Sequence, residues 1–154
     1  LIEEQRYSTQ LPEDLDAAAR KAIVTEGAHV FNEEITLNGI KAASEVYRTT
    51  DLKQRLERYH GEKTAKLFSN WSDVWQSKEF RDFNIEHYLP QVKCPVLSFQ
   101  GVDDEYGSVS QLDAIVSQAG SDKAQKALIE NAAHTPHKEN LDKTLEIVSA
   151  FLSN

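Results

Sequence analysis

Short apolar runs and longer amphipathic segments alternate along most of the chain. Residues 22–27 (AIVTEG) and 96–101 (VLSFQG) are mainly apolar and end at glycine, which predicts two buried strands. Residues 127–130 (ALIE) predict a third, shorter strand, and amphipathic helices are expected around 109–118 and 141–152. Because strands that alternate with helices pair in parallel, this order predicts an α/β fold built on a parallel sheet.

A long helical stretch separates the first two predicted strands. Between residues 32 and 77 the apolar side chains recur at helical spacing, which predicts three consecutive helices with no strand between them. Asn32 is expected to open the first helix, and Gly61 is expected to end the second. Residues 1–21 are an N-terminal segment that is harder to place, although 12–21 have the composition of a helix start.

The composition is that of an ordinary globular domain. The 154 residues carry a formal charge of −8, which argues against nucleic acid as the main partner because the two would repel each other. No window of 18 apolar residues predicts a membrane span, and the N-terminus has no pattern of a signal peptide. Cys94 is the single cysteine and cannot form an internal disulfide, so we expect a cytoplasmic protein.

Candidate chemistry follows two of the predicted strands. Asp103 and Asp104 come directly after the second strand, and His134 lies after the third, in an expected loop at 131–138. Because the carboxyl ends of parallel strands meet at one edge of a sheet, these loops should lie close together. A carboxylate that accepts from one imidazole nitrogen fixes the tautomer, and the other nitrogen can then take a proton from a nucleophile. Either residue alone is more often an ordinary loop group, so the pairing carries the hypothesis.

These motifs resemble part of a known family. Residues 94–104 (CPVLSFQGVDD) resemble the proline, apolar strand and Gly-x-x-Asp signature of α/β-hydrolases, and 133–139 (AHTPHKE) resemble their histidine loop. From about Lys21 onward the chain is similar to the later, C-terminal part of such an enzyme, of the esterase and valacyclovirase-like kind. The resemblance implies that Asp104 is the acid of a catalytic triad and that His134 is its base.

The same resemblance divides the chain into parts. Residues 22–31 resemble the strand that follows the nucleophile helix, and together with 78–154 they imply a portion of the α/β-hydrolase core. The three helices within 32–77 fall where the family inserts a helical cap. The segment 1–21 is left unassigned.

The sequence has no recognisable nucleophile. The family order is nucleophile, acid, histidine, so a Gly-x-Ser-x-Gly elbow should precede Ala22. The only serine before that point is Ser8, which has no glycine near it, and the glycine-rich oxyanion loop and the first strands of the family are missing too. Either the chain is a fragment or the C-terminal part of a split or truncated gene product, or the molecule contains residues that this sequence omits.

Other residues are candidates for a binding site. Trp71 and Trp75 stand one helical turn apart, a spacing that suits either the roof of an apolar pocket or plain helix packing. His29 follows the first predicted strand and is a weaker candidate for the pocket entrance. The remaining histidines are expected at the surface: His60, His87 and His137. No group of His, Cys, Asp and Glu has metal-ligand spacing, so neither a metal nor another cofactor is expected.

Two classes of function stay open at this point. An enzyme would hydrolyse an ester, amide or thioester of a small, partly apolar molecule with a serine nucleophile, and C–C bond hydrolases or perhydrolases would use a similar triad on the same fold. A non-catalytic module would instead be a hydrolase half without the nucleophile. Its exposed sheet edge would favour a second chain or self-association.

Overall fold

The computed structural model describes residues 22–153, so the predictions made for residues 1–21 lie outside the described residues. In chain order its elements are β1 (Ile23–Glu26), α1 (Glu34–Thr49), α2 (Leu52–His60), η3 (Gly61–Lys63), α3 (Thr64–Gln76), η4 (Glu86–Gln91), β2 (Val96–Gly101), α4 (Val109–Gln118), β3 (Ala124–Ile129), α5 (Pro136–Glu139) and α6 (Leu141–Leu152).

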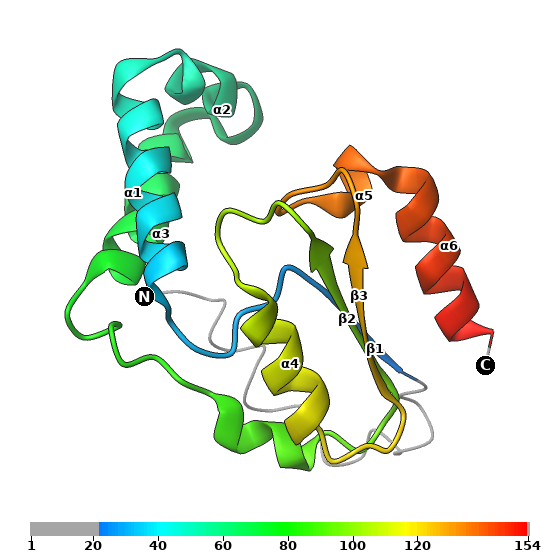
Figure 1. Cartoon of the computed structure of the whole chain (residues 1–154). Coiled ribbons are helices and arrows are strands. Elements are labelled where there is room, and N and C mark those ends of the chain that lie inside the picture. The colour runs from blue at the N-terminus through cyan, green and yellow to red at the C-terminus, as the bar shows by residue number, and fades with distance from the viewer. Residues whose placement is uncertain (1–21, 154) are drawn as a thin grey trace.

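The three strands form one parallel sheet in the order β1-β2-β3. Val96 of β2 pairs with Ile23 of β1 on one side and with Ala124 of β3 on the other. Helix α4 covers one face of this sheet and α6 covers the opposite face (Figure 1). This arrangement confirms the predicted α/β fold with a parallel sheet.

The core of the sheet is built around β2, which is buried along its whole length because both its edges are paired and both its faces are covered. Leu97 and Phe99 pack in one apolar cluster with Phe151 of α6. Val96 points to the other face, where it packs with Ile115 of α4. Burial of each such side chain stabilises the fold by roughly 1.5–3 kcal/mol relative to its exposure in water. This stabilisation fixes the position of β2 and of the loop that follows it.

Helices α1, α2 and α3 pack against one another and stand apart from the sheet (Figure 1). Tyr47 of α1 stacks on Phe68 of α3, with ring centroids 3.8 Å apart. Gly61 ends α2 at a φ of 54°, a conformation that glycine adopts without strain, so this predicted helix end is confirmed. None of the helices in residues 22–153 has the length and apolar character needed to cross a membrane.

Three boundaries differ from the sequence predictions. The first helix begins at Glu34, because Asn32 donates its side-chain amide to a backbone carbonyl beyond α3 instead of capping α1. Strand β3 begins at Ala124, earlier than predicted, because its backbone pairs with β2 from Val96 onward. The exposed, polar Gln125 and Lys126 hide this part of the strand from an apolar pattern. The prediction of a loop at 131–138 was wrong in part, since α5 begins within this range at Pro136. Proline is tolerated there because it occupies the first turn of the helix.

Candidate active site

The loops after β2 and β3 meet at the carboxyl edge of the sheet. Gly101 donates its backbone N–H to the carbonyl of Ala133 at 3.0 Å, and Asp103 donates to the carbonyl of Ala132 at the same distance. A side chain at Gly101 would place its Cβ 1.9 Å from the Ala132 oxygen, so only glycine permits this approach. These contacts set the acid loop (residues 102–108, which include Asp104) directly beside the histidine loop (residues 130–135, which include His134).

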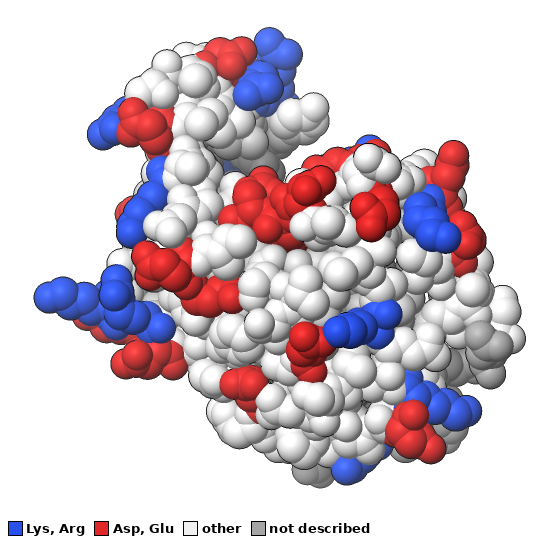
Figure 2. Space-filling view, viewed as in Figure 1, with Lys and Arg blue, Asp and Glu red and all other residues white. Residues whose placement is uncertain are grey.

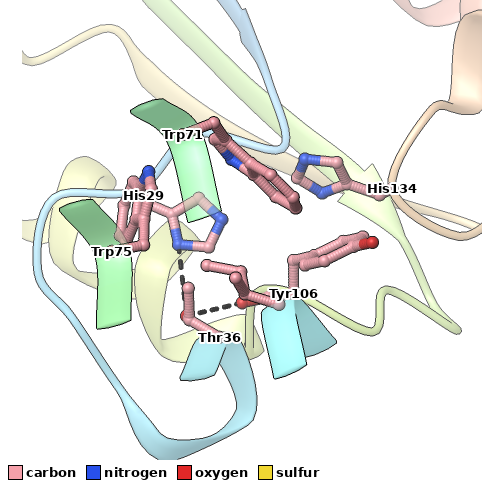
Figure 3. A pocket seen from close by; sticks show the side chains of 7 residues that line it. His29, Thr36, Trp71, Trp75, Tyr106 and His134 are labelled. Atoms are coloured by element: carbon pink, nitrogen blue, oxygen red, sulfur yellow. Dashed lines mark hydrogen bonds between the residues drawn. The ribbon is translucent and has the colours of Figure 1, made fainter. Parts of the chain in front are cut away.

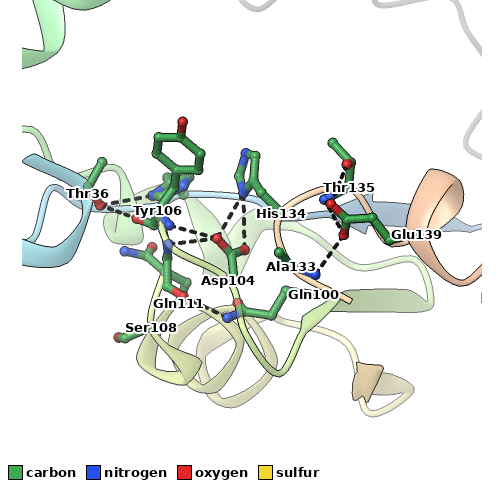
Figure 4. Close-up of polar contacts among 12 residues, drawn as sticks. Thr36, Gln100, Asp104, Tyr106, Ser108, Gln111, Ala133, His134, Thr135 and Glu139 are labelled. Carbon is green, nitrogen blue, oxygen red and sulfur yellow. Dashed lines mark hydrogen bonds and ion pairs between the residues drawn. The ribbon is translucent and has the colours of Figure 1, made fainter. Parts of the chain in front are cut away.

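Asp104 and His134 are brought together by these loops. The His134 Nδ1 lies 3.1 Å from each carboxylate oxygen of Asp104, whose side chain is 1% exposed (Figure 4). The Asp104 Oδ1 also accepts the backbone N–H groups of Tyr106 at 2.8 Å and Gly107 at 3.1 Å. The carboxylate is therefore held rigidly, and it orients the imidazole with Nδ1–H toward itself and Nε2 away.

The electrostatics of the pair favour the charged form of both groups. Burial alone would raise the pKa of Asp104, but the hydrogen bonds from His134 and from the Tyr106 and Gly107 backbones lower it below its ordinary value. The hydrogen bond to Asp104 raises the pKa of His134 above its ordinary value, against the opposing effect of burial. The pair is thus prepared to stabilise a positive charge on the imidazole.

The position of His134 is further restricted by Gly27 and Glu139. Gly27 follows β1 at a φ of 54°, and a Cβ there would lie 2.9 Å from the His134 Cε1. Glu139 accepts the backbone N–H of Ala133 at 2.6 Å and the hydroxyl of Thr135 at 3.0 Å, which ties both neighbours of His134 to one carboxylate (Figure 4). The imidazole is held by its surroundings as well as by its partner.

His134 faces a cavity of about 340 Å³ between the sheet edge and the helices α1 and α3. The cavity is lined by a mainly aromatic and apolar set of side chains (Figure 3): His29, Thr36, Ile40, Trp71, Trp75, Tyr106 and His134. The surface is also hollowed between α1–α3 and the sheet portion, with acidic side chains gathered near that hollow (Figure 2).

Both tryptophans and His29 line this cavity. Trp71 meets Tyr106 edge-on with centroids 6.3 Å apart, and Trp75 meets His29 edge-on at 5.5 Å. The structure therefore places these predicted residues with His134, while their role in binding stays a prediction. Tyr106 also packs edge-on against His134 at 4.9 Å, although its sequence position near Asp104 was not used to predict it.

Two further lining residues, Thr36 and Ile40, were missed from the sequence. They stand four residues apart on α1, so they share one face of the helix. That spacing is visible in the sequence, but nothing in it says which helix face turns toward the histidine loop.

Helix α1 is held against the acid loop by hydrogen bonds that are buried or partly buried. Glu33 accepts the backbone N–H of Ser108 at 2.8 Å and its hydroxyl at 2.7 Å. Gln111, which is fully buried, accepts the backbone N–H of Val30 at 2.8 Å and donates to Glu33 at 2.8 Å. The cavity wall formed by α1 is thus fixed relative to Asp104.

The other candidate residues lie elsewhere. His137 pairs with Glu26 at 2.7 Å and is exposed, as expected, and His60 and His87 are exposed as well. Cys94 precedes β2 and so lies at the opposite end of that strand from Asp104. Within residues 22–153 no serine or cysteine lines the cavity, and no cluster of three or more His, Cys, Asp or Glu side chains is placed to hold a metal ion.

The solved structures that share this fold include hydrolases. The chain is similar to NosK from Streptomyces actuosus, with 14% identity and a TM-score of 0.64 over 85% of this chain and 57% of that one. It is similar to MGS-M2, an α/β-hydrolase enzyme from a Medee basin deep-sea metagenome library, with 16% identity and a TM-score of 0.56 over 87% and 56% of the two chains. A serine hydrolase involved in carbazole degradation, the CarC enzyme, matches with 18% identity and a TM-score of 0.61 over 90% and 56%.

The chain therefore has part of the α/β-hydrolase fold, as the sequence resemblance implied. It spans a little over half the length of these structures, at 56–57%. No family model and no curated protein matches the sequence.

Proposed function

We propose that this chain supplies the acid, the base and the substrate cavity of a serine hydrolase that cleaves an ester, amide or thioester of a small, partly apolar molecule. One observation carries the proposal: His134 holds Nδ1 at 3.1 Å from both oxygens of the buried Asp104 carboxylate, and the same imidazole lines an aromatic cavity. A carboxylate, an imidazole and an adjoining apolar pocket are what acyl transfer requires next to a nucleophile.

In the proposed reaction a serine Oγ attacks the carbonyl carbon, and the His134 Nε2 takes the hydroxyl proton. Asp104 stabilises the resulting imidazolium, which agrees with the raised pKa of His134 and the lowered pKa of Asp104. The imidazolium then gives its proton to the leaving group, and water releases the acyl group by the same steps. The apolar part of the substrate packs against Trp71 and Trp75, with α1–α3 serving as a cap.

Labelling and turnover of the intact protein test this proposal. A serine-reactive fluorophosphonate should modify the protein, and p-nitrophenyl butyrate should be hydrolysed. Replacing His134 with alanine should lower kcat about 100- to 10,000-fold, the usual contribution of general acid–base catalysis. His60→Ala removes an exposed histidine and should leave turnover unchanged. Mass spectrometry of the labelled peptide identifies the nucleophile, and a protein that is neither labelled nor active would refute the proposal.

A second candidate function is a non-catalytic, partner-associating half of a hydrolase fold. It is favoured by the absence of serine and cysteine from the cavity lining in residues 22–153. The outer edge of β1, where Val24 is 39% exposed, has no strand paired to it among these residues. Native mass spectrometry of an unlabelled, inactive protein should then show a dimer or a defined complex. A stable, inert monomer would contradict this second candidate.

A further inference from the structure

A second imidazole faces the cavity and has no part in the proposed acyl transfer. His29 follows β1, is half-buried, and has its ring centroid 5.9 Å from that of His134. Figure 3 shows its ring between Trp75 and Thr36, pointing into the space that the two tryptophans enclose. A polar ring at this depth needs a hydrogen-bonding partner, either from the protein or from a ligand.

The contact with Thr36 determines which nitrogen of His29 is available. The Thr36 hydroxyl donates its one proton to the backbone carbonyl of Tyr106 at 2.6 Å. The same oxygen lies 3.5 Å from the His29 Nδ1, so in this long contact it can only accept. This arrangement favours the neutral tautomer that carries its proton on Nδ1, which leaves a lone pair on Nε2. Within the described part of the chain, no group donates a hydrogen bond to Nε2.

The ring is also kept neutral. Burial and the neighbouring His134 lower the pKa of His29 below its ordinary value, and the opposing effects of Asp104 and Glu33 do not offset them. The pKa of His134, in contrast, is raised. The two imidazoles of one cavity are thus prepared for different tasks, one for carrying a proton and the other for accepting a hydrogen bond.

We propose that the His29 Nε2 is a specificity subsite that accepts a hydrogen bond from an uncharged hydroxyl or amide N–H of the ligand, whose apolar body packs against Trp71 and Trp75. As a substrate subsite it rests on the proposed function, but as a ligand site it does not. An analogue without the donor leaves this acceptor unpaired, so binding forgoes the hydrogen bond and still bears the cost of desolvating the ring. The substrate class is accordingly a small, partly aromatic or apolar ester or amide with a neutral donor.

Fragment binding tests the subsite without any turnover. The protein has two tryptophans and both line the cavity, so intrinsic tryptophan fluorescence reports its occupation. Benzyl alcohol carries a donor, whereas benzyl methyl ether keeps the ring and the acceptor but has none. We expect His29→Phe to reduce the preference for the alcohol over the ether about 10-fold, the equivalent of one hydrogen bond. The control His60→Phe alters an exposed histidine and should leave the preference unchanged.

Nitrogen-15 NMR of the unaltered protein provides a measurement that does not depend on how the variant folds. At pH 7 the His29 ring should show a protonated Nδ1 and an unprotonated Nε2. A protonated Nε2, an unchanged preference in His29→Phe, or an unaltered protein that binds neither fragment would each overturn the inference. Failure of the proposed hydrolase function looks different, because fluorophosphonate labelling would be absent while the alcohol preference persists.

Discussion

The replacement of Gly27 by alanine tests the structure of the acid–base pair most directly. Gly27 has a φ of 54°, and its missing Cβ would lie 2.9 Å from the His134 Cε1 and 3.0 Å from Nδ1. Both the backbone conformation and the space beside the imidazole therefore require glycine. Alanine must displace the His134 ring, and this displacement distorts the hydrogen bonds between His134 and Asp104.

Two costs can be assigned to this substitution. An L-residue at this positive φ costs about 1–2 kcal/mol. Forcing an extra methyl group against a packed ring costs about 1–3 kcal/mol more. The Nδ1 already lies 3.1 Å from both Asp104 oxygens, so a shift of a few tenths of an ångström weakens both contacts. We expect the free energy of unfolding to fall by about 2–5 kcal/mol and the pKa of His134 to fall toward its ordinary value.

Gly61→Ala is the matched control for Gly27→Ala. Gly61 also has a φ of 54°, but a Cβ there meets nothing within 4 Å. Gly61→Ala should therefore reduce stability through the backbone conformation alone and leave the titration of His134 unchanged. Urea unfolding followed by tryptophan fluorescence measures the stability, and NMR titration of the histidines measures the pKa. If Gly27→Ala left the pKa of His134 where it was, the proposed restraint by Gly27 would be refuted.

Three further predictions concern the site and its surroundings. The raised pKa of His134 adds stability that is fully present at low pH and is lost as the pH rises through that pKa. The lowered pKa of Asp104 adds stability that is present at higher pH and is lost as the pH falls through that pKa. Asp104→Asn should therefore flatten both limbs of a stability–pH profile measured by urea unfolding. Gln111→Leu leaves two backbone groups without their buried partner and should lower the free energy of unfolding by about 2–4 kcal/mol, which an unchanged urea midpoint would contradict. Lys126→Ala removes only the exposed ion pair with Asp113 and should cost less than about 1 kcal/mol in thermal unfolding.

Much of the fold was predictable because it depends on local patterns. The run 96–101 between turn residues, the glycine at position 61 and the apolar stripe of 141–152 each specify an element through periodicity and backbone preference. Asp104 and His134 were predictable as neighbours because the residues after parallel strands share one edge of the sheet. The polar start of β3 was not predictable, because backbone pairing with β2, and not an apolar side-chain pattern, makes these residues a strand.

The sequence by itself determined the order of strands and helices, the placement of an acid and a histidine after adjacent strands, and the resemblance to α/β-hydrolases. Only the tertiary structure decided which other residues line the cavity beside this acid and this histidine. Thr36 and Ile40 reach the cavity because Gln111 and Glu33 hold α1 against the acid loop, which carries Tyr106. This long-range contact leaves no local signature in the sequence. The neutral state of His29 likewise depends on its burial and on its closeness to His134, since a pKa responds to neighbours in space rather than in sequence.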